Sequence, residues 1–243
     1  MRVAFVGKGG TGKSTIAGTV ARLVGRRGDR VLALDIDTMP GLALTLGMRT
    51  DQRGLPASLA EQRVGIGWVM KWDTAPGALV AQHAVIGPDN VRLLTLGKLP
   101  GWVSPGSSTA FRHVALGFRV SGWSVVCDLA AGTRQAFFGW ARFADTVVFV
   151  VEPTAKSILS ARRLGRLRTS MDARFVVVAS KVRGDDDVRM IADALGMPVI
   201  GAVPYDEAVR DAERAGLAPI EAVPDAPAIR AITALLPLLE VPS

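Results

Sequence analysis

The sequence has little cysteine and few aromatic residues. Among its 243 residues there is a single cysteine, Cys127, and 6% are aromatic. One cysteine excludes a disulfide within the chain and a metal site built only from cysteines, and it fits the reducing conditions of the cytoplasm. The low aromatic content comes with 21% charged residues and no biased tract, which excludes a disordered or collagen-like chain.

Long apolar runs are also lacking. The run TVVFVV at 146–151 lies between Asp145 and Glu152, and no run approaches the ~20 residues that span a bilayer. We therefore expect a soluble protein without a transmembrane segment. The stretch 228–243 has one arginine and an internal proline, so we expect it to pack on the core and expect no membrane-binding helix there.

Basic residues exceed acidic ones. The 29 lysines and arginines and the 22 aspartates and glutamates give a net charge of +7. This balance favours polyanionic partners such as DNA, phosphate-rich ligands or acidic lipid. Most of the arginines do not cluster, however, which favours the alternative of scattered surface charge.

Apolar runs and helical patterns alternate along most of the chain. Strands are expected at 3–6, 31–35, 123–129, 146–151, 175–180 and 198–203. Helices are expected at 14–27, 137–143, 155–170, 186–195, 206–215 and 226–238, with Gly25 and Gly28 ending the first. This alternation predicts an α/β fold, a mostly parallel twisted sheet with helices on both faces. No linker interrupts it, so residues 1–243 are expected to form one domain.

The stretch 47–121 has irregular spacing of glycine, proline and tryptophan. Only two short strands, at 66–70 and 91–96, and a helix near 108–119 are expected in it.

A complete phosphate-binding motif follows the first strand. Residues 7–15 read GKGGTGKST, which is G-x-x-x-x-G-K-S between a strand and a helix. The glycines allow successive N–H groups to face phosphate oxygens, and the helix N-terminus adds positive potential. Lys13 would neutralise the β- and γ-phosphates, and the Ser14 hydroxyl would bind Mg²⁺. The predicted phosphate ligands are Gly9, Gly10, Thr11, Gly12, Lys13, Ser14 and Thr15.

Lys8 is a second lysine inside this loop. The pattern KGGTGKST resembles the deviant Walker A motif of the ParA/MinD superfamily of P-loop ATPases. The resemblance implies a homodimer with ATP between the subunits and Lys8 reaching the partner's nucleotide. Spacing alone shows only a second cation near the phosphates, and the alternatives are a contact within the subunit or a solvated lysine.

Two aspartates follow the second strand, in LALDIDTMPG at 32–41. Strand alternation puts Asp35 and Asp37 on the same side, at the end of a parallel strand where ligands bind. In the superfamily the second aspartate of D-x-D-P polarises the attacking water and lies near Mg²⁺, which implies that role for Asp37. Here the proline comes later, at Pro40, and the alternative role of Asp37 is to cap the next helix.

Asp128 ends another apolar strand, in SVVCDLAAG at 124–132. This pattern resembles Walker B with switch II, in which Asp128 holds Mg²⁺ through a water and the Gly132 amide binds the γ-phosphate. The alternative for Asp128 is a strand-end cap. Cys127 points to the opposite face and is expected in the core.

Later segments at 147–164, 179–187 and 201–221 resemble CooC-type ATPases, which assist nickel insertion into carbon monoxide dehydrogenase. In those proteins two subunits share a metal ion through a Cys-x-Cys pair. The corresponding stretch of this sequence, 96–106, has no cysteine. Thiolate ligation is therefore excluded at that site. His83 and His113 lack metal-ligand spacing, so no transition-metal site is expected.

The base pocket also departs from the resemblance, because Ser180 stands where an asparagine often precedes Lys181. Lys181 and the backbone of the segment Pro204, Tyr205 and Asp206 are expected to contact the base. ATP is the expected nucleotide, with GTP as the alternative.

The resemblance implies an ATPase that dimerises on ATP, turns over slowly alone and regulates or matures an unidentified client protein. The alternative is a partition-type ATPase that binds DNA nonspecifically, through basic residues after the strand predicted at 146–151. Those residues are Lys156, Arg162, Arg163, Arg166 and Arg168.

Overall fold

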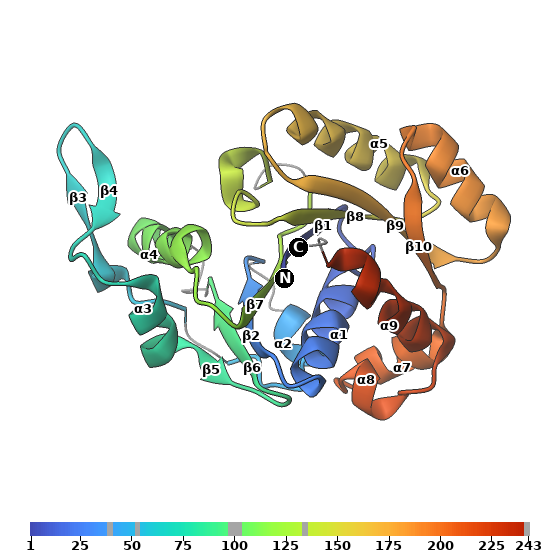
Figure 1. The fold of residues 1–243 in the computed structure, drawn as a ribbon, viewed down its shortest axis with the longest axis horizontal. Coiled ribbons are helices and arrows are strands. Elements are labelled where there is room, and N and C mark those ends of the chain that lie inside the picture. The colour runs from blue at the N-terminus through green and yellow to red at the C-terminus, as the bar shows by residue number, and fades with distance from the viewer. Residues whose placement is uncertain (38–40, 52–53, 97–103, 133–135, 241–243) are drawn as a thin grey trace.

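The computed structural model describes residues 1–37, 41–51, 54–96, 104–132 and 136–240. Its centre is a sheet of eight strands. They are β1 (Arg2–Gly7), β2 (Arg30–Asp35), β5 (Val85–Ile86), β6 (Val91–Thr95), β7 (Trp123–Asp128), β8 (Thr146–Val151), β9 (Arg174–Val182) and β10 (Val199–Pro204). Their order is β10-β9-β8-β1-β7-β2-β6-β5 (Figure 1). Every neighbouring pair is parallel except β5 with β6, which confirms the mostly parallel sheet.

Helices cover both faces of the sheet, as Figure 1 shows. One face carries α3 (Pro76–His83), α4 (Pro105–Gly117), α5 (Ala155–Leu164) and α6 (Asp185–Leu195). The other carries α1 (Lys13–Arg26), α2 (Gly41–Thr45), α7 (Glu207–Arg214), α8 (Pro219–Ala222) and α9 (Pro227–Leu239). The side chains of β1 alternate between the two faces of the sheet. Val3 and Phe5 therefore lie in one core, and Ala4 and Val6 lie in the other.

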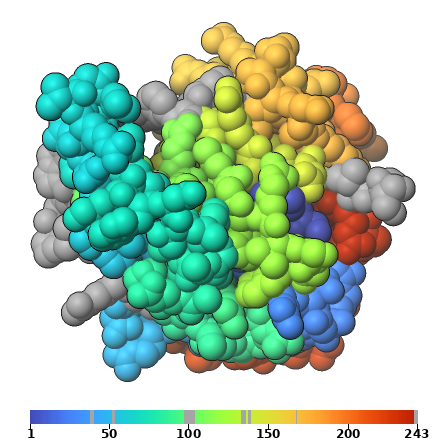
Figure 2. Space-filling model, turned by 60° about the vertical axis from the view of Figure 1, so that its left-hand side comes forward, coloured from blue at the N-terminus to red at the C-terminus, as the bar shows by residue number. Residues whose placement is uncertain are grey.

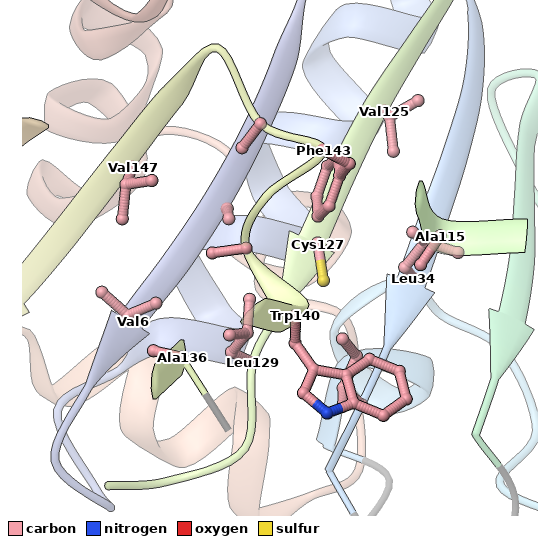
Figure 3. Packing of buried hydrophobic residues seen from close by; sticks show 14 of the residues in the cluster. Val6, Leu34, Ala115, Val125, Cys127, Leu129, Ala136, Trp140, Phe143 and Val147 are labelled. Atoms are coloured by element: carbon pink, nitrogen blue, oxygen red, sulfur yellow. The ribbon is translucent and has the colours of Figure 1, made fainter. Parts of the chain in front are cut away.

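Figure 3 shows part of the core under α4. Cys127 lies there beside Phe143 and Trp140, and its side chain is fully buried, as expected. Trp140 also packs against Phe111 of α4, with 6.0 Å between the ring centroids. This core fixes the positions of β2 and β7, whose carboxyl ends carry the candidate site.

A second, antiparallel sheet of two strands, β3 (Ala60–Arg63) and β4 (Gly67–Met70), forms a hairpin beside α4. It stands out from the rest of the molecule in Figures 1 and 2. Gly106 of α4 allows this contact, because a Cβ there would lie 3.1 Å from the Trp68 ring of β4 and 2.6 Å from the carbonyl oxygen of Ala57, just before β3.

Several expected elements differ. The helix expected at 137–143 is only a π-helical turn, Ala136–Trp140, because Gly139 adopts a left-handed backbone with φ 79°. The helix expected at 155–170 ends at Leu164 and continues as a 3₁₀ turn, Gly165–Thr169. Gly25 lies within α1 and does not end it. The helix expected near 108–119 begins at Pro105, after Ser104 caps its N-terminus.

Candidate functional site

A cavity of about 450 Å³ lies at the carboxyl ends of the parallel strands. Its walls are the phosphate loop, the segment after β2, Ala131, the ends of β9 and β10, and the helices α1, α2, α7 and α9. Of the predicted site residues, Gly9, Gly10, Gly12, Lys13, Ser14, Thr15, Asp37, Lys181, Pro204, Tyr205 and Asp206 all line it. The sheet thus brings segments from both ends of the chain to one chamber.

The loop between β1 and α1 has the backbone that the motif predicts. Gly10 and Gly12 both have φ 83°, a left-handed conformation that glycine adopts without strain. The loop is tied internally, because the Thr11 hydroxyl donates to the Lys8 carbonyl oxygen at 3.0 Å. Lys13 Nζ donates to the same oxygen at 3.1 Å. Burial lowers the pKa of Lys13, while the nearby Asp128 and Asp37 carboxylates act in the opposite direction.

Ser14 and Asp128 meet at the floor of this loop. The Ser14 hydroxyl donates to Asp128 Oδ2 at 2.5 Å. Asp128 is 1% exposed, and its other oxygen, Oδ1, has no hydrogen-bond partner among the described residues. Burial raises the pKa of Asp128 to about 6. A buried carboxylate with an unpartnered oxygen next to a hydroxyl and a lysine is a set of groups that fits a hydrated Mg²⁺.

Asp35 and Asp37 occupy different environments. Asp37 lines the cavity, whereas Asp35 is fully buried beneath it. The backbone N–H of Asp37 donates to Asp35 Oδ1 at 3.0 Å. Burial, and then the neighbouring Asp128, raise the pKa of Asp35 well above its usual range. Residues 38–40, which include the displaced proline, lie outside the described part of the chain.

Gly132, expected to offer its amide to a γ-phosphate, uses that amide here in another way. Its N–H donates to the Gly7 carbonyl oxygen at 3.0 Å, in an isolated antiparallel bridge. The γ-phosphate contact remains a prediction, and it requires this hydrogen bond to break.

Lys181 contacts the phosphate loop itself. Its backbone is left-handed, with φ 57°. Its Nζ donates to the Gly10 carbonyl oxygen at 2.5 Å and pairs with a Glu152 carboxylate oxygen at 3.2 Å. Sequence reasoning missed Glu152, since nothing in VVEPT indicates a partner at the end of another strand. The pair connects the ends of β8 and β9 to the loop.

The segment after β10 has a structural part and a cavity-facing part. The Asp206 carboxylate accepts the N–H groups of Ala208 and Val209 in α7 and of Ala228 in α9, at 3.0, 3.3 and 3.1 Å. Its side chain therefore caps two helices and is not available to read a base. Tyr205 lines the cavity, and its hydroxyl accepts from Arg210 Nη1 at 2.7 Å.

Glu213 of α7 also lines the cavity, and the Thr15 hydroxyl donates to its carboxylate. This contact brings a carboxylate from late in the chain to the first turn of α1. It was not among the expected site residues.

The family model of the CobQ/CobB/MinD/ParA nucleotide binding domain matches residues 3–220. The chain belongs to this family. The predicted resemblance to ParA and MinD ATPases is therefore confirmed.

Individual members of the MinD/ParA family cover most of the chain. An uncharacterized ATP-binding protein of Methanocaldococcus jannaschii is 32% identical over 237 residues, which cover 89% of this chain and 90% of the relative. The carbon monoxide dehydrogenase accessory protein CooC of Rhodospirillum rubrum is 30% identical over 240 residues, with 89% and 88% covered. The septum site-determining protein MinD of Pyrococcus horikoshii, solved with Mg-ADP, matches with a TM-score of 0.74. It is 18% identical, with 98% of this chain and 95% of that one covered, and it confirms the MinD-like fold.

Among the described residues, no three histidine, cysteine, aspartate or glutamate side chains gather as metal ligands. His113 Nε2 lies 2.9 Å from the Thr74 carbonyl oxygen, in a hydrogen bond that packs α4 against the segment before α3. Most of the stretch matched to the Cys-x-Cys region, residues 97–103, lies outside the described residues.

The basic residues of the α5 region are exposed to solvent, and none of them lines the nucleotide cavity. Arg162 is partly engaged, because its Nε donates to the Ala194 carbonyl oxygen of α6 at 2.8 Å. In the described part of the chain, no helix has the length and apolar character needed to cross a membrane.

Proposed function

We propose that this MinD/ParA-family protein binds ATP with Mg²⁺ in the 450 Å³ cavity and hydrolyses it to ADP and phosphate. The observation that carries the proposal is the buried Asp128 beside Ser14 and Lys13, with one oxygen left for a hydrated cation. Membership of a nucleotide-binding family supports it. An adenine nucleotide is favoured because relatives that cover most of the chain are named as ATP-binding proteins.

Each residue of the phosphate loop has a defined task in this proposal. Lys13 swings from the Lys8 carbonyl to the β- and γ-phosphates, while the loop amides bind phosphate oxygens. Ser14 and Asp128 would hold Mg²⁺, Asp128 through a water. When bound, Mg²⁺ neutralises phosphate charge and orients the leaving group. Asp37 orients and polarises the attacking water, since its carboxylate lines the cavity near Lys13.

Lys8 completes the site of a second subunit. Its Nζ contacts only the neighbouring Gly9 carbonyl oxygen among the described residues, at 3.2 Å. This weak local contact leaves the ammonium ready to reach across a dimer interface. We propose that ATP closes a homodimer and that hydrolysis opens it, because ADP cannot make the γ-phosphate contacts that distinguish the two states.

The dimer cycle would regulate or mature a client protein in the cytoplasm. Two relatives support a role of this kind, one named as an accessory protein and the other as an antiactivator, FleN of Pseudomonas aeruginosa. Trapping the closed dimer offers the most direct route to the client, through capture with Asp37→Ala protein and ATP.

Calorimetry and light scattering test the proposal. Titration of the protein with Mg-ATP should release or absorb heat, and Lys13→Ala should abolish binding. Dimers should form with ATP in the parent and in Asp37→Ala, and Lys8→Ala should prevent them. No heat with the parent protein would refute nucleotide binding. Dimers that persist unchanged in Lys8→Ala would refute its action across the interface.

The alternative is nonspecific DNA binding by the same ATP-bound dimer. The exposed Arg163, Arg166 and Arg168 near α5 favour it, because clustered cations release counterions from DNA. In a gel-shift series with rising salt, binding should weaken steeply, and Arg163→Ala with Arg166→Ala should lower the salt slope by about 2 for each subunit that contacts the DNA. Salt-independent or absent retention would rule out this alternative.

A further inference from the structure

We propose that Asp35 is a positioning residue that holds Asp37 in place for hydrolysis. The inference rests on the proposed function and adds to it a residue beneath the cavity. Asp35 ends β2, and in the sheet register it lies next to Asp128 of β7 on one side and Thr95 of β6 on the other. The three side chains therefore form a row across the carboxyl ends of three parallel strands.

The row is buried and polar. Asp35, Asp128 and Thr95 are 0%, 1% and 6% exposed. Each has one side-chain oxygen without a hydrogen-bond partner among the described residues, namely Asp35 Oδ2, Asp128 Oδ1 and Thr95 Oγ1. Buried oxygens without a hydrogen-bond partner disfavour folding. Folding alone therefore gives no reason for a carboxylate at the end of β2.

The other oxygen of Asp35 is engaged with the segment that follows. Oδ1 accepts the backbone N–H of Asp37 at 3.0 Å. The carboxylate thus fixes the backbone of the segment that directly follows β2. The Asp37 side chain starts from this anchored residue, so its place in the cavity depends on Asp35.

This arrangement makes Asp35 a support for Asp37 and leaves contact with the nucleotide to Asp37. Misplacing a catalytic group by about 1 Å can slow a reaction about 100-fold. The anchoring requires a hydrogen-bond acceptor but not a negative charge. Asparagine supplies an acceptor oxygen for the Asp37 amide and keeps the size of the side chain. Alanine supplies no acceptor.

Asp35→Ala and Asp35→Asn are expected to differ in their rate of ATP hydrolysis. In single-turnover ATP hydrolysis, Asp35→Ala should lower the rate about 10- to 100-fold, with the Kd for Mg-ATP within about threefold of the parent. Asp35→Asn should stay within about threefold of the parent in both quantities. An Asp35→Asn protein that hydrolyses as slowly as Asp35→Ala would show that charge matters, and would overturn the proposal. If Asp35→Ala does not fold, Asp35→Asn alone decides, and a tenfold or larger loss of rate overturns it.

A double-mutant cycle separates positioning from a general effect on the fold. In the Asp37→Ala background, Asp35→Ala should cause no further loss of rate, because the group that it positions is already gone. A further loss of the same size as in the parent would refute the coupling. The cycle also distinguishes the two levels of proposal. An Asp37→Ala protein with the parent rate would refute the role of Asp37, whereas a slow Asp37→Ala protein with a parent-rate Asp35→Ala would refute only the role of Asp35.

Discussion

Replacing Arg22 by methionine should destabilise the protein far more than the same change at Arg26. Both arginines lie on α1 and both pair with Asp89 Oδ2, Arg22 at 2.5 Å and Arg26 at 2.9 Å. Arg22 also pairs with Glu221 of α8 at 2.5 Å and donates to the Leu46 carbonyl oxygen at 2.8 Å. One guanidinium therefore connects α1 with three other segments.

Burial decides the expected magnitudes. The Arg22 side chain is 2% exposed and that of Arg26 is 40% exposed. Removing one partner of a buried ion pair costs about 3–5 kcal/mol. The lower end applies to Arg22→Met, because the Asp89 and Glu221 side chains are 24% and 50% exposed and water can solvate them. An exposed pair is worth about 1 kcal/mol or less, which sets the value for Arg26→Met.

Equilibrium urea unfolding followed by circular dichroism measures the difference. Arg22→Met should lower the free energy of unfolding by about 3 kcal/mol, which corresponds to a fall in Tm of roughly 6–12 °C. The hydrogen bonds from Arg22 and Arg26 outweigh the effect of burial and lower the pKa of Asp89. The loss should therefore shrink as the pH falls below the ordinary value of 3.8. Equal, small effects at Arg22 and Arg26 would refute this reasoning.

Three further predictions concern the site and its support. Asp128→Asn should stabilise the nucleotide-free protein at pH 7.5 by about 3 kcal/mol, and not at pH 3. The pKa of Asp128 in the folded protein, about 6, lies above the ordinary 3.8. The parent protein therefore loses stability as the pH rises between these two values, and the loss is complete above pH 6. Thermal melting at both pH values checks this, and an equal effect of the substitution at both would contradict it. Lys181→Met should weaken Mg-ATP binding about fivefold in calorimetry, since it removes the contacts with Gly10 and Glu152; unchanged affinity would contradict it. Gly25→Ala should lower the free energy of unfolding in urea by about 3 kcal/mol, because its Cβ would lie 1.7 Å from the Asp89 carbonyl oxygen. Gly165 has open space around it, so Gly165→Ala should change the free energy of unfolding by no more than about 0.5 kcal/mol.

The phosphate loop could be predicted because its signal is local. Nine consecutive residues carry the backbone conformation, the lysine and the hydroxyl, and the flanking strand and helix are equally clear. Lys181 was expected near the base, but its contact with Gly10 joins residues 171 positions apart. Glu152 and Glu213 could not be predicted for the same reason, because their partners, Lys181 and Thr15, are also distant in the sequence. These pairs become apparent only when the fold is known.

The capping role of Asp206 could have been predicted. An aspartate directly before a helical pattern, followed by a glutamate, is a common N-terminal signal. The first role of Asp206, as the N-cap of α7, therefore has a local signal in the sequence. Its second role, capping α9 through Ala228, depends on tertiary structure and has no local signal.

In the stretch 47–121, the strands expected at 66–70 and 91–96 correspond to β4 and β6, and the helix expected near 108–119 corresponds to α4. The strand β3 could not be predicted, because its four residues are too few for a clear alternation. The helix α3 is likewise short, with two buried residues, Leu79 and Val80. Such elements depend on packing against α4 more than on their own sequence preferences.

The position of β1 has a consequence for how the protein is made. The first strand of the chain is also a middle strand of the sheet, between β7 and β8, which follow more than 110 residues later. During synthesis, Val3, Phe5 and their apolar neighbours must leave the ribosome long before either neighbouring strand exists. Pairings so distant in sequence form slowly and leave apolar surface open to aggregation. The apolar side chains of β1 therefore do not have both neighbouring strands until residue 151 has been synthesised.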